Sequence, residues 1–506
     1  YIYNVPQILA RHADNTNSYT IVIFVQYFYC TFFYFCLTSS PLENINNEPE
    51  VTNEQRTGPM GPRHLPNLYP LPLHRPVPCS ERWVLRCMNM TRPGLARRPY
   101  MTQQNSVGTH DIIDLVLSLE WHSAQGRHQE THHFPNYNVW RDIDLLPPAL
   151  QGEILHQPQG HTGSAKIAAG EITPLHDPGL VRKIRRHSFN GRFQGRKITP
   201  CAGRFYPQGM IDALPGEFSA SMLPLRITEL DEHWLTCDLN HPLAGHDFTV
   251  SSTIGAIHGA PDEHGGRCQD AMEQLLHGPG MQARVARQPT DFFCGDSFQR
   301  MDATADSGFY RTARMTEHLD SRALHEVEQL YASLLPGGAR VLDLMASIDS
   351  HVTDADATIV GLGMNADELA ANQRLSEHLV HDLNQQPALP YADDSFGAVI
   401  CTVSVEYLVN PLEVFSEVRR VLKPGGLFIN IFSNRWFPPK VIALWIDLHE
   451  FERMGLVSEY YHRTGGFGVV NTRSLRGLSR PEDDRYSGQT GQSDPVFAVW
   501  ASKDSS

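Results

Sequence analysis

The segment EVFSEVRRVLKPGGLFINIFSN, Glu413–Asn434, decides the fold of the C-terminal third of the chain. Apolar residues recur at helical spacing in its first half, which predicts a helix over Leu412–Leu422. Pro424-Gly425-Gly426 then predicts a turn, and Leu427–Phe432 is an apolar run typical of a buried strand. An amphipathic helix followed at once by a continuously apolar strand indicates a parallel sheet that helices cover on both faces.

The same alternation runs through the whole C-terminal part. A helix is expected over Glu317–Leu335, where apolar residues keep helical spacing up to the turn Pro336-Gly337-Gly338. The further elements expected are strands at 340–344, 358–362, 379–382, 398–402 and 495–501, and a helix at 366–374. Together they predict an α/β, Rossmann-like doubly wound domain over residues 317–506. Ligands of such domains bind outside the carboxyl ends of the strands.

Three segments occur here in an order that resembles a known family. They are RVLDL (Arg340–Leu344), HDLNQQPALPYADDSFGAVICTVSVEYL (His381–Leu408) and the helix, turn and strand of Glu413–Asn434. This succession is similar to the class I S-adenosylmethionine-dependent methyltransferases, especially their type 11 group. The resemblance implies S-adenosylmethionine as the cofactor and methyl transfer to a small-molecule or polypeptide acceptor.

The resemblance also implies a cofactor site at the ends of the first three strands. In the family a glycine-rich loop follows the first strand, because backbone without a Cβ can approach the methionine part of the cofactor. Here that loop, Asp343–His351, contains no glycine, and Gly363 stands where the family places an acid for the ribose hydroxyls. Asn365 or Asp367 could replace that acid if the loop shifts. The residues expected at the cofactor are Asp343, Met345, Ser347, Gly363, Asn365, Asp382 and Leu383, the last two beside the adenine.

Glu406 and Tyr407 follow the fourth strand, where the family carries residues that face the methyl acceptor. Methyl transfer is an in-line displacement, so the protein mainly aligns the reactants and supplies a general base where one is needed. An alternative stays open, in which Tyr407 is a packing residue and Glu406 an acid favoured at a helix start. The aromatic segment Trp436-Phe437 either caps the acceptor pocket or begins the next helix.

Residues 111–258 show a different pattern, with many short strands around one helical patch at Leu145–Ile154. A strand from Ile112 ends in Trp121, and Gln125-Gly126 turns it into a hairpin. Further strands are expected at 163–171, 223–230, 234–238 and 248–257, with a basic, loop-rich insertion at 182–204. This pattern predicts a small α+β half-barrel.

The ends of this region resemble the FKBP-type, SlyD-like peptidyl-prolyl isomerases. The similar stretches are LVLSLEWHSAQGRHQET (Leu115–Thr131) and PLRITELDEHWLTCDLNHPLAGHDFTV (Pro224–Val250), whose turn Asn240–Gly245 is the most specific part. The resemblance implies an isomerase pocket at Trp121, Leu150 and Phe248, an insertion that holds unfolded chain, and proline-containing polypeptides as partners.

This chain departs from the isomerase pattern at Gln129-Glu130, at Leu175 and at Pro147-Pro148, where proline lacks the backbone donor of the family. Three functions therefore remain open. The first is a methyltransferase with an attached isomerase-like module. The second is an isomerase or chaperone whose methyltransferase domain is inactive, and the third is a binding protein without enzymatic activity.

Composition narrows the class of protein. The chain has 506 residues, 41% of them hydrophobic and 19% charged, which is typical of a soluble protein with two or three domains. A net charge of −14 argues against a nucleic-acid partner. The nine cysteines form no CxxC pair, so we expect free thiols in the cytoplasm and no metal site, His128 and His132 included.

The first hundred residues contain no lysine and include an uncharged, aromatic run at Tyr19–Leu37. About 19 apolar residues are long enough to span a bilayer, so a membrane anchor is one interpretation. The other is a disordered or spurious extension, with Met101 as the natural start. The predicted division is an extension (1–100), an FKBP/SlyD-like domain (101–258), a linker (259–316) and a methyltransferase-like domain (317–506).

Overall fold

The computed structural model describes residues 106–505, except 194, 195, 213, 215–217, 267 and 287, together with three strands nearer the N-terminus. The chain forms two compact units, Tyr1–Leu95 and Ala96–Ser506. In the first unit an antiparallel sheet has the order β1 (Gln7–Ala10), β2 (Ile21–Phe24), β3 (Cys36–Leu37). The rest of the apolar run at 19–37 lies outside the described residues. No helix among the described residues is long and apolar enough to cross a membrane.

In the second unit the C-terminal strands form a sheet of order β16-β15-β14-β17-β18-β20-β19. These strands are β14 (Arg340–Leu344), β15 (Thr358–Gly363), β16 (Leu375–Val380), β17 (Phe396–Thr402), β18 (Leu422–Phe432), β19 (Val470–Arg476) and β20 (Val496–Ser502). The strands from β16 to β18 are parallel, and β20 runs antiparallel to both neighbours. The chain order reverses at β14, which confirms the predicted Rossmann-like fold and places the crevice at the carboxyl ends of β14 and β17.

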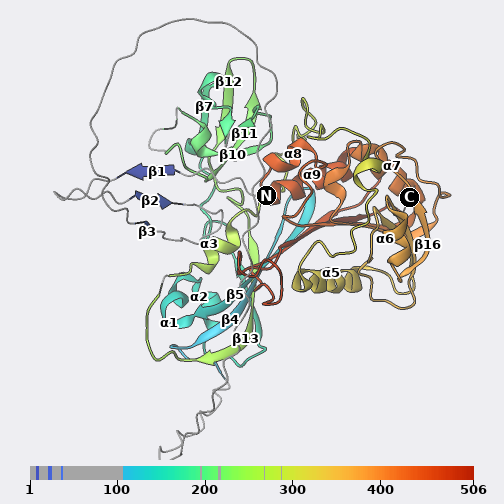
Figure 1. The fold of residues 1–506 in the computed structure, drawn as a ribbon. Coiled ribbons are helices and arrows are strands. Elements are labelled where there is room, and N and C mark those ends of the chain that lie inside the picture. The colour runs from blue at the N-terminus through green and yellow to red at the C-terminus, as the bar shows by residue number, and fades with distance from the viewer. Residues whose placement is uncertain are drawn as a thin grey trace, which may run out of the picture. The chain divides into compact units, whose positions relative to one another are not determined.

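Helices cover both faces of this sheet (Figure 1). The helices are α5 (Ser321–Leu334), α6 (Ala366–Ala371), α7 (Pro411–Val421), α8 (Ala443–Asp447) and α9 (Glu450–Thr464). Alternate strand residues belong to two different cores: Val341 packs with α5, whereas Leu342 packs with α7 and α9. Burial on both faces explains why these strands read as continuous apolar runs.

Several predicted bounds in this part were wrong. The strand β18 begins at Leu422 and contains the predicted turn Pro424-Gly425-Gly426, and α6 ends at Ala371. The helix expected from Glu317 begins at Ser321, because the Asp320 carboxylate caps it by accepting from the backbone N–H groups of Arg322 and Ala323. The strand expected at 379–382 is β16 at Leu375–Val380. This strand lies at the sheet edge and is largely exposed, so its sequence lacks the apolar run of a central strand.

The middle region contains a second set of antiparallel strands, in the order β5-β4-β13-β6. They are β4 (Ile112–His122), β5 (Gly126–Asn138), β6 (Thr162–Ile167) and β13 (Phe248–Gly259), accompanied by α1 (Val139–Asp142), α2 (Pro148–Gly152) and α3 (Ala271–Leu276). Alternate residues of β4 are buried, so one face of this sheet packs on α1, α2 and α3. This arrangement agrees with the strands and the helical patch predicted from the sequence.

The insertion between β6 and β13 forms a separate four-stranded sheet (Figure 1). Its order is β10 (Phe205–Pro207), β11 (Pro224–Leu230), β12 (Trp234–Asp238), β7 (Val181–Arg185), and a short hairpin joins β8 (Arg192–Phe193) to β9 (Arg196–Lys197). The stretch 182–204 was predicted to be loop-rich, yet it contributes β7 and the β8–β9 hairpin. The basic side chains of this stretch gave no apolar strand pattern, because β7 lies exposed at the sheet edge.

The two strand sets are parts of one eleven-stranded sheet, because β19 pairs in parallel with β5. Glu130 of β5 is fully buried at this junction and accepts hydrogen bonds from Ser474 Oγ of β19 (2.5 Å) and Gln282 Nε2 (2.6 Å). An edge strand that would otherwise expose its backbone groups is thereby covered. The predicted boundary at residue 258 falls within this unit and stays a prediction.

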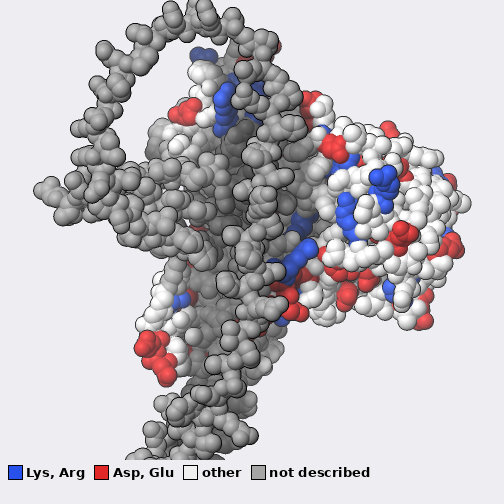
Figure 2. Space-filling view, in the orientation of Figure 1, with Lys and Arg blue, Asp and Glu red and all other residues white. Residues whose placement is uncertain are grey.

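On the face drawn in Figure 2, acidic and basic side chains are interspersed over the visible surface of the C-terminal part. Mixed charge of this kind is ordinary for a protein surface.

Candidate active site

An open cavity of about 110 Å³ lies at the carboxyl ends of β14, β15, β16 and β17. The loops after these four strands line it. The segment 306–318, which precedes α5, and Phe437, which follows β18, also contribute to the lining. Its position is the one that the reversal of strand order predicts for a ligand.

All seven residues predicted at the cofactor line this cavity. They are Asp343, Met345, Ser347, Gly363, Asn365, Asp382 and Leu383. The structure thus brings together positions spread over 40 residues of sequence, while their role in binding stays a prediction.

The loop after β14 departs from the glycine-rich pattern in sequence but keeps a left-handed backbone. Met345, at the first glycine position of the family pattern, has φ +59°. His351 (φ +55°) and Val403 (φ +49°) are also left-handed and also line the cavity. Each such residue costs on the order of 1 kcal/mol, and strain of this kind gathers at functional sites.

Gly363 lacks an acidic side chain for a steric reason. A Cβ on this residue would lie 2.2 Å from the carbonyl oxygen of Ala346. The Ala346 N–H donates to the Leu362 carbonyl (2.9 Å), which holds the first loop against the end of β15. The acid that the family places here is therefore excluded by the path of the loop.

Two carboxylate oxygens in the cavity have no hydrogen-bond partner. These buried atoms are Oδ2 of Asp343 and Oδ2 of Asp382. The other oxygen of Asp382 accepts from the backbone N–H groups of Asn384 (3.0 Å) and Gln385 (3.2 Å). Burial raises the pKa of the Asp343 carboxyl to about 7. Buried polar atoms without partners are rare, so both oxygens are available to donors on a ligand.

Asn365 acts as a structural residue in this arrangement. Its Oδ1 caps α6 by accepting from Asp367 and Glu368, and its Nδ2 donates to the carbonyls of Tyr310 (2.8 Å) and Arg311 (3.1 Å). It therefore ties the segment before α5 to the end of β15.

Glu368 is a cavity acid that the sequence analysis missed. Its carboxylate accepts from Ser347 Oγ (2.7 Å) and from the backbone N–H of Arg314 (2.7 Å). It lies five residues beyond the position where the family carries an acid, so the motif gave no sign of it.

Glu406 and Tyr407 occupy different environments. Tyr407 lines the cavity, and its hydroxyl accepts from the backbone N–H of Phe437 (2.8 Å). Glu406 does not line it. Its side chain is fully buried, both carboxylate oxygens lack a partner, and burial raises its pKa to about 8.

The segment predicted as a linker contributes much of the cavity wall. Asp306 is fixed by Arg300 (2.8 Å), Asn384 (2.9 Å) and Lys440 (3.3 Å). Tyr310, Arg314 and Thr316 of this segment also line the cavity, as does His318 just after it. The aromatic pair Phe309-Tyr310 was the only signal in the sequence, because polar loop residues carry no periodicity.

The predicted isomerase pocket residues lie in the core of the middle region. Trp121, Leu150 and Phe248 are buried in one apolar cluster. The Trp121 ring stacks on His128 at a centroid distance of 4.1 Å, and its Nε1 donates to Glu130 Oε1 (3.3 Å). None of the three lines the cavity at the carboxyl edge of the sheet, and their role stays a prediction.

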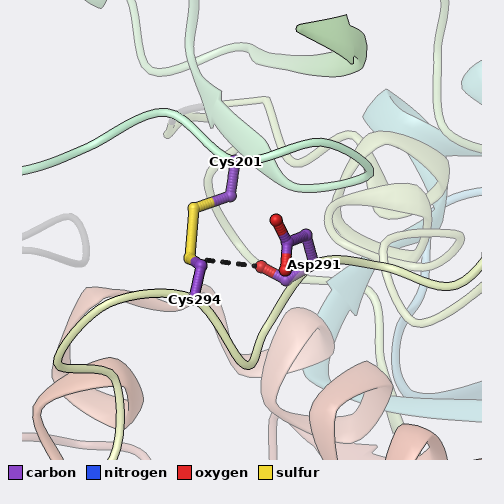
Figure 3. Close-up of side chains that lie close together, drawn as sticks. All are labelled: Cys201, Asp291 and Cys294. Atoms are coloured by element: carbon purple, nitrogen blue, oxygen red, sulfur yellow. Dashed lines mark hydrogen bonds between the residues drawn. A yellow bond between two sulfur atoms is a disulfide. The ribbon is translucent and has the colours of Figure 1, made fainter.

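The expectation of free thiols was wrong for two cysteines. Cys201 of the insertion and Cys294 of the segment before α5 form a disulfide, and the Cys294 sulfur also lies 3.5 Å from the carbonyl oxygen of Asp291 (Figure 3). The sequence separation of 93 residues hid this pairing, since no local spacing reports it. Cys237, Cys268 and Cys401 are free. Ligand atoms of Cys201, Asp291 and Cys294 lie within 4.8 Å of one another, and the absence of a metal site stays a prediction.

Comparison with known proteins adds family information for part of the chain. The biotin biosynthesis bifunctional protein BioHC of Teredinibacter turnerae is 40% identical over 62 residues, which are 12% of this chain and 10% of that protein. A demethylmenaquinone methyltransferase of Renibacterium salmoninarum is 32% identical over 106 residues, 20% of this chain and 45% of that protein. The chain thus covers less than half of either relative.

Solved structures of two S-adenosylmethionine-dependent methyltransferases are also similar. The one from Aquifex aeolicus has 16% identity and a TM-score of 0.25, over 37% of this chain and 91% of that one. The one from Mesorhizobium loti has 16% identity and a TM-score of 0.23, over 36% and 100%. The family model described as a methyltransferase domain matches residues 334–430, the stretch that holds the cavity loops after β14, β15 and β17.

Proposed function

We propose that this chain is an S-adenosylmethionine-dependent methyltransferase whose active site is the cavity at the carboxyl edge of the C-terminal sheet. One observation carries the proposal: the seven predicted cofactor residues share this cavity, and two of them hold buried carboxylate oxygens without partners. The cofactor offers amino groups as donors, so its chemistry fits these oxygens.

Each of these carboxylates has a distinct role in the proposal. Asp382 Oδ2 accepts from the exocyclic amino group of the adenine, and Leu383 packs on the ring. Asp343 faces the ammonium group of the methionine part, where a positive charge favours the ionised carboxylate. When bound, the cofactor supplies an electrophilic methyl group on a sulfonium.

In this proposal the methyl acceptor binds between Tyr407, Phe437 and His318. Tyr407 and Phe437 stack with their ring centroids 6.1 Å apart, and His318 packs edge-on against Phe437 at 5.3 Å. Burial lowers the pKa of His318, so its imidazole is neutral at pH 7 and accepts a proton from the acceptor. Glu406 holds its own proton at pH 7, so it serves as a buried neutral acid and not as the base.

Calorimetric titration of the full chain with S-adenosylmethionine tests the proposal. We expect saturable binding, weakened about tenfold or more in Asp382→Asn because the amide presents a donor to the adenine amino group. Glu413→Ala, an exposed carboxylate on α7, is the matched control and should bind like the wild type. Absence of binding to a folded wild-type chain would overturn the proposal.

Prolyl isomerisation is a second candidate, favoured by apolar exposure on the insertion. Large side chains are open to solvent there, with relative exposures of 61% for Leu175, 77% for Phe218 and 60% for Leu223. In this proposal these exposed apolar side chains contact the polypeptide that is isomerised.

Isomerisation of a proline-containing peptide, measured with Trp121→Phe, tests this second activity. We expect a rate reduced about tenfold, because the smaller ring disturbs the packing of the cluster that also holds Leu150 and Phe248. Trp234→Phe on β12 is the control and should leave the rate unchanged. If the isomerisation rate of the peptide were the same with and without the protein, the chain would have no isomerase activity. The middle region would then be a binding module.

A further inference from the structure

The charges around the cavity are unevenly distributed. The lining residues include six carboxylates, Asp306, Glu317, Asp343, Asp349, Glu368 and Asp382. Arg314 is the single arginine or lysine among the described residues that line the cavity. An anionic group that enters this cavity therefore finds one permanent positive charge.

The guanidinium of Arg314 is held by aromatic rings and is incompletely hydrogen-bonded. Its central carbon lies 4.6 Å from the ring centroid of Phe309, 5.0 Å from that of Phe437 and 5.5 Å from that of Tyr310. Nη2 donates to the Phe309 carbonyl (3.2 Å), whereas Nη1 is buried and has no partner. A buried donor without an acceptor costs stability, so this N–H is suited to donate to an anionic ligand.

The backbone of the same residue is fixed in place. The Arg314 N–H donates to Glu368 Oε1 (2.7 Å), and Asn365 Nδ2 holds the carbonyls of residues 310 and 311. The aromatic rings restrain the side chain further through cation–π contact. The guanidinium is therefore preorganised, which reduces the entropy lost on binding.

We propose that Arg314 binds the carboxylate of the methionine part of S-adenosylmethionine, an inference that rests on the function proposed above. The planar guanidinium matches a carboxylate in two parallel hydrogen bonds. Asp343 faces the ammonium group and Arg314 the carboxylate, so the two residues orient the amino-acid end of the cofactor.

Decarboxylated S-adenosylmethionine, which lacks only this carboxylate, provides the test. We expect the full-length wild type to bind S-adenosylmethionine about 10- to 100-fold more tightly than the decarboxylated analogue, as for a buried charge-assisted pair. Arg314→Met should lose that factor for S-adenosylmethionine and leave the affinity for the analogue unchanged. Arg314→Lys, which keeps the charge without the planar fork, should recover part of it.

Arg311→Met is the matched control, an exposed arginine three residues away that does not line the cavity. It should bind both ligands like the wild type. Binding of the analogue by Arg314→Met also shows that this variant is folded.

Three outcomes would overturn the assignment, and they are distinguishable. If Arg314→Met bound S-adenosylmethionine with unchanged affinity, Arg314 would not bind the cofactor carboxylate. It would then be assigned to an anionic methyl acceptor. An equal loss for both ligands would mean that Arg314 only supports the cavity wall. A wild type that binds neither ligand would overturn the proposed function itself.

Discussion

Two places in one continuous sheet differ in whether their buried carboxylates have hydrogen-bond partners. In the middle region, Glu130 of β5 is fully buried and has three side-chain partners, Ser474, Gln282 and Trp121. At the carboxyl edge of the C-terminal strands, Asp343 and Asp382 each keep a buried oxygen without a partner. At that edge Met345 and Val403 also hold left-handed backbone conformations.

This difference separates a structural polar group from a functional one. A satisfied network fixes one packing arrangement, whereas unpaired atoms and backbone strain persist only where something else offsets their cost. The cavity therefore carries the signature of a binding site, and the β5–β19 junction carries that of a structural joint. Burial alone does not distinguish the two, because both sets of carboxylates are withdrawn from water.

The largest effect is expected at the joint. Glu130→Ala leaves the donors of Ser474 and Gln282 buried without an acceptor, which should lower the free energy of unfolding by about 3 kcal/mol. Urea unfolding measures the change. Glu120→Ala, on the exposed face of β4, is the control and should change stability by less than about 0.5 kcal/mol. Equal effects of the two substitutions would contradict a structural role for Glu130.

A smaller but still clear loss is expected at the cavity floor. Gly363→Ala places a Cβ 2.2 Å from the Ala346 carbonyl, so the first loop must shift and stability should fall by about 2 kcal/mol. Gly363→Asp, which restores the acid of the family, should therefore weaken cofactor binding as well. Gly397→Ala is the control, because its Cβ would meet Ala339 at an ordinary 3.6 Å. A Gly363→Ala variant more stable than the wild type would show that the first loop moves away from the new Cβ without loss of stability.

The third effect is a change of stability with pH. The folded pKa of Asp343 is about 7, above its usual value, so the native state holds this proton between about pH 4 and pH 7. Stability from this group is present below pH 4 and is lost as the pH rises to 7. Asp343→Asn removes that loss, so its stability relative to the wild type should rise by at most about 4 kcal/mol between pH 4 and pH 8, at about 1.4 kcal/mol per pH unit from about pH 4 to pH 7. Urea unfolding at both pH values measures it, and a constant difference would exclude an elevated pKa.

Much of the C-terminal fold could be predicted from the sequence. Strands buried on both faces must be apolar throughout, and the helices between them must be amphipathic, so local pattern alone reports a parallel covered sheet. The cavity residues could be predicted for the same reason. The carboxyl ends of such strands meet at one edge, so Asp343, Gly363 and Asp382 lie together once the strands are recognised.

Tertiary structure decided what no local pattern reports. Three features join residues that are roughly 90 to 340 positions apart in the sequence. They are the pairing of β19 with β5, the Cys201–Cys294 disulfide and the contact of the Arg314 guanidinium with the Phe437 ring. The resemblance assigned Trp121 to a pocket, and only the packing of the middle region showed it buried among core residues. The sequence by itself determined the strands, the helices and the edge at which we propose that the cofactor binds, because period and burial are local. Which polar atoms remain unpaired at that edge was decided by long-range packing, because a partner counts only when the fold brings it within hydrogen-bonding distance.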